Sequence, residues 1–275
     1  MSSRGSEDHP VNGLGSSRRR MRKIYIVPNF VTTANLFAGF YSVIASMQGD
    51  YVTAAWSILA AAVCDALDGR IARLAKATSQ FGVEYDSLSD LLSFGMAPAI
   101  LLYQWALVPY GRLGWLAAFL FVACGALRLA RFNVTSSLLP KGFFQGLPIP
   151  MAAGLVATFI IFHQSVGWPT DKQTPVLFLT FGLASLMVST IRFPSFKELN
   201  WRSKTSFGYL IVGVLGMILI ATKPEVTLFL LLSTYIGAGL VWNVIRLVTG
   251  PSASERTKAA RAAAHIEHSW HGQGD

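Results

Sequence analysis

Residues 51–75 read YVTAAWSILAAAVCDALDGRIARLA, and this stretch decides the fold class. Its first part, residues 51–64, carries no charged side chain, and Asp65 and Asp68 follow it. A helix needs about 20 predominantly apolar residues to cross a bilayer. The run is continuous, whereas the strands of a membrane β-barrel alternate between apolar and polar residues. The stretch therefore predicts a transmembrane helix that ends in two aspartates.

Similar apolar runs occupy most of the chain. Of the 275 residues, 52% are hydrophobic and only 13% are charged, and the mean hydropathy is +0.46. This composition is too apolar for a water-soluble domain and leaves little chain for a separate extramembrane enzyme. We predict an all-α integral membrane protein with eight transmembrane helices. The other seven cover residues 32–49, 87–109, 113–133, 147–168, 174–192, 205–222 and 226–245.

Lysine and arginine residues predict the orientation of these helices. Twenty of the 23 fall in the two tails and in alternate connections, whereas Arg112, Lys172 and Lys223 fall in the others. Basic residues concentrate on the cytoplasmic side of membrane proteins, so we predict that both termini are cytoplasmic. The net charge of +9 lies between apolar runs, which favours anionic membrane lipids over nucleic acid as the partner.

The two ends of the chain are polar. Residues 1–23 predict a basic cytoplasmic tail, and residues 250–275 predict a second cytoplasmic tail. We expect Pro28 to separate a short N-terminal interfacial helix from the first membrane span, because proline interrupts helices. The basic run before Pro28 would hold that helix against anionic headgroups.

Four aspartates lie at the ends of predicted membrane helices, where charged side chains are energetically unfavourable. Asp65 and Asp68 share one helix face, and Asp86 and Asp90 share a face of the next helix. Each aspartate near a helix centre costs about 2.5–3.5 kcal/mol. Four carboxylates brought together by the intervening turn predict bound divalent cations, and oxygen ligands favour Mg²⁺, Mn²⁺ or Ca²⁺ over zinc. Two such ions about 4 Å apart stabilise displacement at phosphorus.

Two alternatives stay open from the residues alone. Aspartates and arginines at helix ends are also ordinary boundary residues at the cytoplasmic face. Intramembrane carboxylates also occur in cation or proton transporters. Neither alternative accounts for the whole set of aspartates at this spacing.

The spacing of these residues resembles a family signature. The string Asp65-x2-Asp68-Gly69-x2-Ala72-Arg73-x8-Gly82-x3-Asp86-x3-Asp90 is similar to that of the CDP-alcohol phosphotransferase family. The resemblance implies a six-helix membrane core, residues 24–200, that transfers a phosphatidyl or similar group from a CDP-linked donor to an alcohol and releases CMP. Residues 201–249 would add two helices outside this core.

The resemblance also implies roles for individual residues. Asp65 and Asp86 would bridge two divalent cations, Mg²⁺ or Mn²⁺, and Asp68 would complete one of the two sites. Asp90 would ligate the other cation and serve as the catalytic general base. The positions that would contact the donor are Asn29, Thr32, Gly69, Arg73, Ser79 and Gly82.

Within the family, residues 28–36, 81–88, 128–133 and 146–150 are similar to the phosphatidylserine synthase branch. This similarity implies CDP-diacylglycerol as donor, L-serine as acceptor, a bacterial cell membrane as location with the active site on its cytoplasmic side, and a homodimer. Glycerol phosphate or an inositol phosphate remains the alternative acceptor. The candidate acceptor contacts are Arg128, Arg131, Asn133 and Glu84. The two arginines are interpretable equally well as basic anchors at the cytoplasmic face.

Overall fold

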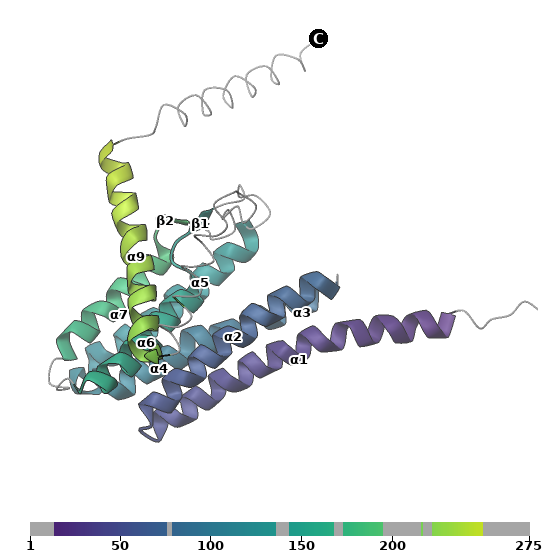
Figure 1. The fold of residues 1–275 in the computed structure, drawn as a ribbon, viewed down its shortest axis with the longest axis horizontal. Helices are drawn as coiled ribbons and strands as arrows, with labels where there is room; N and C mark the ends of the chain where they lie inside the picture. Colours follow the sequence, from purple (N-terminus) through teal and green to yellow (C-terminus); the bar gives the residue numbers. More distant parts are fainter. Residues whose placement is uncertain are drawn as a thin grey trace, which may run out of the picture.

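The structure, a computed structural model, describes residues 14–75, 79–135, 143–167, 173–194, 216 and 222–249. Figure 1 shows these residues as a bundle of helices. In chain order the α-helices of this part are α1 (Leu14–Met47), α2 (Tyr51–Ala75), α3 (Gln80–Asp90), α4 (Ala97–Leu102), α5 (Arg112–Thr135), α6 (Ile149–Val166), α7 (Gln173–Val188) and α9 (Pro224–Thr249). The π-helical turns η1 (Leu91–Met96) and η2 (Tyr103–Leu107) and the 3₁₀ turn η3 (Val108–Tyr110) continue α3 and α4 as one rod.

The first two helices form an antiparallel pair that lies side by side in Figure 1. Gly49, with a φ of 82°, makes the turn between them. Asp50 then caps α2, because its Oδ1 accepts a hydrogen bond from the Thr53 backbone N–H at 3.0 Å. Hydrogen bonds from the side chain and the backbone of Thr53 hold the pKa of the Asp50 carboxyl below its ordinary value of 3.8.

Within the residues that the structure describes, six helical stretches are long and apolar enough to cross a membrane. These are Asn29–Met47, Tyr51–Ile71, Gln80–Tyr110, Arg112–Val134, Ile149–Val166 and Pro224–Ile245. The predicted span at 174–192 corresponds to a shorter apolar helix, Thr174–Val188. The predicted span at 205–222 lies almost wholly outside the described residues, so the number eight stays a prediction. The described part of this membrane protein is helical apart from one small strand pair.

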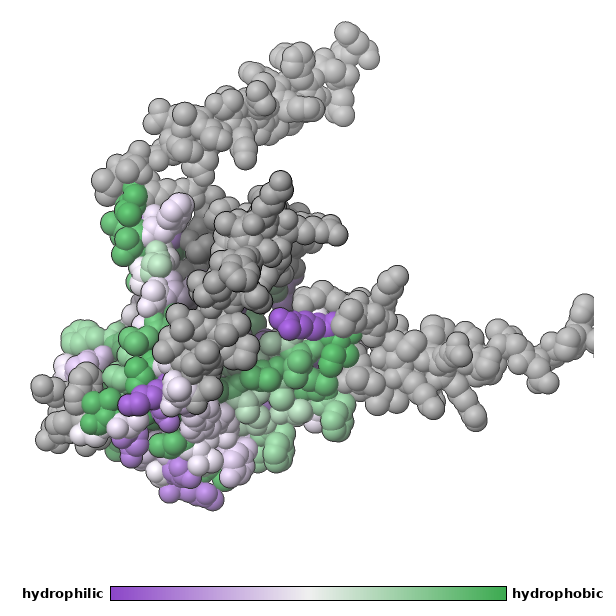
Figure 2. All heavy atoms as spheres, viewed as in Figure 1, coloured by the Kyte–Doolittle hydropathy of each residue, from purple (hydrophilic) through white to green (hydrophobic). Residues whose placement is uncertain are grey.

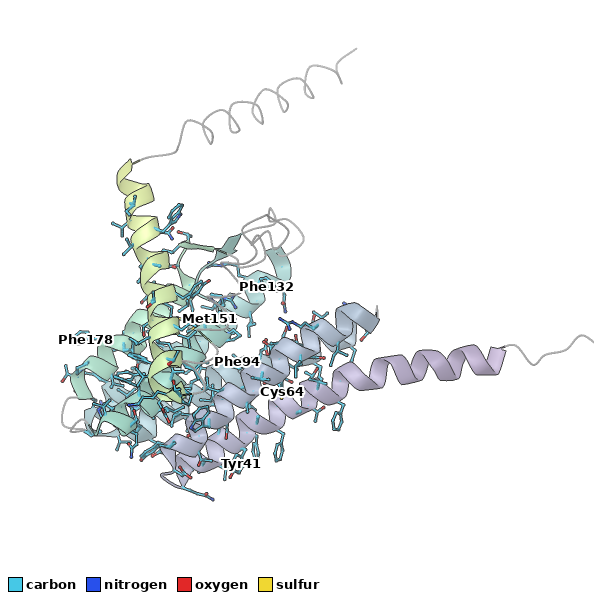
Figure 3. The ribbon with its side chains drawn as sticks, viewed as in Figure 1. Tyr41, Cys64, Phe94, Phe132, Met151 and Phe178 are labelled. Atoms are coloured by element: carbon cyan, nitrogen blue, oxygen red, sulfur yellow. The ribbon has the colours of Figure 1, made fainter. Side chains whose placement is uncertain are left out.

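Apolar side chains occupy both the interior and much of the surface. Phe94 is fully buried at the centre of the bundle, whereas Tyr41 and Phe178 point away from it (Figure 3). Figure 2 shows apolar residues over much of the exposed surface of the described helices. An exposed apolar surface is stable in contact with lipid chains, and so the surface fits a bilayer. Helix α9 packs on α6 and stands out from the rest of the bundle in Figure 1.

Two expectations are corrected by the backbone. Helix α1 runs from Leu14 through Pro28, so the expected break at Pro28 is absent and part of the expected N-terminal tail is helical, while the interfacial location of the residues before Pro28 stays a prediction. Proline removes only one helical hydrogen bond, and a long helix can continue past that loss. In addition, strands β1 (Phe143–Gln145) and β2 (Arg192–Pro194) pair antiparallel in an otherwise helical chain.

Candidate active site

Three of the four aspartates converge between α2 and α3. Asp65, Asp86 and Asp90 each place one carboxylate oxygen so that all three oxygens lie within 4.8 Å of one another. Helix α1 packs against both α2 and α3 and holds them together. Cys64, the residue directly before Asp65, is labelled on α2 in Figure 3. Three negative charges at this separation repel one another, and such a group of oxygen ligands could hold a divalent cation.

Asp68 is positioned differently from the other three aspartates. Its Oδ2 accepts a hydrogen bond from the hydroxyl of Thr32 on α1. Asp68 is nevertheless close enough to Asp65 and Asp86 to interact with both electrostatically. Of the four carboxylates predicted to lie together, three therefore form a compact group. The fourth, that of Asp68, lies next to this group and is hydrogen-bonded to Thr32 on α1.

Unpartnered oxygen atoms test whether a cation fits this site. Asp68 Oδ1 and Asp86 Oδ1 are both buried and have no hydrogen-bond partner among the described residues. A buried carboxylate oxygen without a donor is strongly unfavourable unless a cation satisfies it. The donor set contains only carboxylate oxygens, which suits hard divalent ions. The residues present therefore fit the cations that the sequence pattern predicted.

Asp90 has two further neighbours that come from other helices. Asn35 on α1 donates from Nδ2 to Asp90 Oδ1 at 3.1 Å. Arg128 on α5 is buried and interacts electrostatically with the Asp90 carboxylate. The π-helical turn η1 begins directly after Asp90. Such turns are frequent at functional sites because they alter the direction of side chains within a helix.

Three of the expected donor contacts lie together at the start of α3. The Ser79 hydroxyl caps this helix by accepting a hydrogen bond from the Gly82 N–H at 3.0 Å. A side chain on Gly82 would begin 3.2 Å from Ser79 Oγ and 3.7 Å from Asn29 Oδ1. Helix N-termini favour anions such as phosphate. Residues 29, 79 and 82 thus lie together at a helix N-terminus, a position that favours an anion.

The remaining donor candidates are less closely grouped. Thr32 is buried, and its hydroxyl donates to Asp68. Gly69 is exposed, with open space where a side chain would project, so a ligand can approach its backbone. The side chain of Arg73 lies outside the part of the chain that the structure describes.

The four acceptor candidates separate into one buried residue and three at the periphery. Arg128 is the buried one, and it interacts electrostatically with Asp90. Arg131 donates from Nη1 to the Val188 carbonyl at 2.9 Å, at the C-terminal end of α7. Asn133 donates to Ser87 Oγ at 3.0 Å, and Glu84 is exposed on α3. Of the four, Arg128 is therefore the one that is buried and that interacts electrostatically with an aspartate of the acidic group.

Comparison with known proteins agrees with this arrangement. Residues 25–191, which include every residue of the site, match the model of the CDP-alcohol phosphatidyltransferase family. The chain belongs to this family. It is therefore an enzyme of the transferase class, embedded in a membrane.

Individual relatives carry more specific names. The chain is 36% identical over 225 residues to CDP-diacylglycerol--serine O-phosphatidyltransferase of Helicobacter pylori (strain ATCC 700392 / 26695), and the alignment covers 81% of this chain and 91% of that one. It is 36% identical over 174 residues to the protein of the same name from Bacillus subtilis (strain 168), covering 62% and 92%. It is also 34% identical over 178 residues to archaetidylserine synthase of Methanothermobacter thermautotrophicus, covering 64% and 72%.

The sequence pattern alone gave no role to Asn35. This residue follows Thr32 by three positions, so both side chains lie on one face of α1 and reach two different aspartates. A polar pair at helical spacing within an apolar span was the available signal. Only the packing of α1 against α3 connects it to Asp90.

Proposed function

We propose that this chain transfers the phosphatidyl group of CDP-diacylglycerol to the hydroxyl of L-serine, which gives phosphatidylserine and CMP. The observation that carries the proposal is the convergence of Asp65, Asp86 and Asp90 oxygens within 4.8 Å inside a membrane-spanning bundle. The names of the relatives support CDP-diacylglycerol as donor and serine as acceptor.

The aspartates would hold two divalent cations, Mg²⁺ or Mn²⁺. Asp65 and Asp86 would be shared between the two ions, with Asp68 on one side and Asp90 on the other. The buried oxygens Asp68 Oδ1 and Asp86 Oδ1 are available for this role. When bound, the ions neutralise the diphosphate of the donor and stabilise CMP as the leaving group.

The chain's own residues would orient the donor and remove a proton from the acceptor. The N-terminus of α3, with Ser79, Gly82 and Asn29 around it, would bind the diphosphate. The serine oxygen would form a bond to the phosphorus that carries diacylglycerol, as the bond from this phosphorus to the CMP oxygen breaks. The Asp90 carboxylate would accept the proton of the serine hydroxyl.

Serine also carries a carboxylate that must be recognised. Arg128 is buried and interacts electrostatically with Asp90, and its Nε has no hydrogen-bond partner among the described residues. A guanidinium with free donors suits a carboxylate in a planar, paired arrangement. Arg128 would therefore bind the serine carboxylate and bring the hydroxyl to Asp90.

The site would face the cytoplasm of a bacterial cell. In the predicted topology, twenty of the 23 basic residues fall on the side of the membrane at which α2 ends and α3 begins. This asymmetry supports cytoplasmic termini and a cytoplasmic approach for serine, a water-soluble substrate. The lipid donor would enter from the inner leaflet, and two copies of the chain would associate as a homodimer.

Release of CMP by the purified protein tests the proposed function. The protein in detergent is given CDP-diacylglycerol, Mg²⁺ or Mn²⁺, and one acceptor at a time. We expect CMP to appear with L-serine, and its formation to stop on chelation of the metal. CMP formation only with glycerol phosphate or an inositol phosphate would identify another acceptor. Ion flux through vesicles without CMP release from any acceptor would indicate a transporter.

A further inference from the structure

Asn35 is a fully buried amide in the membrane-spanning part of α1. Burial of an amide in apolar surroundings is unfavourable unless its polar atoms are hydrogen-bonded. Its Nδ2 has a partner, Asp90 Oδ1 at 3.1 Å. Its Oδ1 is buried and has no partner among the described residues. The Asn35 Nδ2 is thus hydrogen-bonded to the proposed general base, whereas Oδ1 is an acceptor without a donor among the described residues.

The position of Asn35 is fixed by the packing of α1 against η1. Its backbone carbonyl accepts a hydrogen bond from Ser93 Oγ at 3.0 Å. One turn further along α1, Gly39 allows the helices to touch, because a Cβ there would lie 2.7 Å from Ser93 Cα. These contacts fix the backbone of α1 at Asn35, and the bond from Nδ2 to Asp90 Oδ1 then orients the side-chain amide.

Arg128 on α5 interacts electrostatically with the same carboxylate and also has an unpartnered buried nitrogen. Asp90 thus has an amide with an unpartnered acceptor bonded to it from α1, and a buried cation within electrostatic range on α5. An α-amino acid with a side-chain hydroxyl presents three matching groups, namely an ammonium, a carboxylate and a hydroxyl. Each unsatisfied group around Asp90 has one counterpart in such a molecule.

We infer that Asn35 determines acceptor specificity by accepting a hydrogen bond from the ammonium group of the acceptor through Oδ1, while its Nδ2 positions Asp90. This inference rests on the proposed function. It assigns the ammonium to Asn35, the carboxylate to Arg128 and the hydroxyl to Asp90. The substrate class that satisfies all three is a zwitterionic β-hydroxy amino acid.

Acceptor analogues separate these assignments. 3-Hydroxypropionate lacks the ammonium of L-serine, and ethanolamine lacks the carboxylate. For the wild type we expect kcat/KM, measured by CMP release, to be about 10- to 100-fold higher for L-serine than for 3-hydroxypropionate, the range for a hydrogen bond to a charged group. Equal use of the two acceptors by the wild type would overturn the inference without any variant.

The variants form a crossed pair. In Asn35→Leu we expect the preference for L-serine over 3-hydroxypropionate to fall to about one, and the preference over ethanolamine to persist. In Arg128→Gln we expect the preference for L-serine over ethanolamine to fall to about one, and the preference over 3-hydroxypropionate to persist. The KM for CDP-diacylglycerol should change less than about twofold in both variants. A residue with a purely structural role would lower activity with all acceptors alike and leave their ratios unchanged, which would refute the assignment to Asn35.

A matched control lies on the same helix. Ser42 is also a buried polar residue of α1 with an unpartnered side-chain oxygen, so Ser42→Ala should keep both preferences. If Asn35→Leu does not fold, Asn35→Ser tests the same loss with a smaller polar side chain. Failure of the wild type to release CMP with L-serine would overturn the proposed function itself. Serine-dependent CMP release with unchanged ratios in the Asn35 variants would overturn the inference alone.

Discussion

Thr32 on α1 donates a hydrogen bond to Asp68 on α2, a residue 36 positions away in the sequence. This contact orients a carboxylate whose other oxygen is buried without a partner. A residue that orients a metal ligand commonly affects metal affinity by about 10- to 100-fold. We therefore expect Thr32→Val to raise the Mn²⁺ or Mg²⁺ concentration needed for half-maximal CMP release by about that factor, with Thr32→Ser close to the wild type.

The control for this prediction is Thr158→Val. Thr158 is also buried, but its hydroxyl bonds to the Gly154 carbonyl of its own helix α6. Its replacement should leave the metal requirement unchanged. Equal metal requirements for Thr32→Val and the wild type would show that the Thr32 contact does not support metal binding.

Repulsion among Asp65, Asp86 and Asp90 should make the metal-free protein less stable than a variant with fewer charges. We expect Asp86→Asn to melt at least about 2 °C above the wild type in the presence of a chelator, the shift that about 1 kcal/mol gives in a chain of this size. Added Mn²⁺ should raise the melting temperature of the wild type and not that of the variant. Asp50→Asn, at the opposite end of α2, should respond to Mn²⁺ as the wild type does.

Asp90→Asn should abolish turnover and largely spare donor binding. The amide keeps the shape of the side chain but cannot accept the serine proton, and general-base catalysis contributes about 10²- to 10⁴-fold. CMP release gives the rate, and retention of radiolabelled CDP-diacylglycerol gives donor binding. Near-normal turnover in this variant would exclude Asp90 as the general base.

Gly39 should tolerate no side chain, since a Cβ there would lie 2.3 Å from Ser93 Oγ. We expect Gly39→Ala to lower the free energy of unfolding by about 1–3 kcal/mol, the usual effect of overpacking. Activity should fall as well, because the same approach of α1 to η1 sets the contact between Asn35 and Asp90. Thermal melting in detergent and CMP release measure the two effects.

Gly182→Ala is the matched control, because open space surrounds the position that its Cβ would occupy on α7. Its stability should equal or exceed that of the wild type, since alanine favours helix more than glycine does. Similar melting temperatures for the two variants would show that α1 can move away from η1 without loss.

The cap of α2 should make stability depend on pH. The Thr53 hydrogen bonds lower the folded-state pKa of Asp50 below 3.8, so the carboxylate stabilises the fold above that pH. This contribution is lost as the pH falls through the folded-state pKa. Asp50→Ala should therefore melt below the wild type near neutral pH, and the difference should shrink at a pH below 3.8. A difference that does not change with pH would contradict this account.

The membrane helices and the acidic site can be predicted from the amino-acid sequence. Long uncharged runs predict membrane helices, because a bilayer leaves a backbone few ways to satisfy its hydrogen bonds. The spacing of the four aspartates also predicts a shared acidic site, because residues three or four positions apart lie on one face of a helix. The two pairs are Asp65 with Asp68 and Asp86 with Asp90. At Pro28 the sequence-based prediction was wrong. Proline predicts the end of a helix, but α1 continues through this residue.

The tertiary structure decided which polar groups meet around the aspartates. Sequence spacing treats Arg128 and Arg131 alike, yet packing buries Arg128 within electrostatic range of Asp90 and bonds Arg131 to the end of α7. It also brings Thr32 to Asp68 and Asn35 to Asp90. Periodicity fixes which residues share a face of one helix, whereas the partners across helices depend on how closely the helices approach, and side-chain volumes such as that missing at Gly39 set that distance.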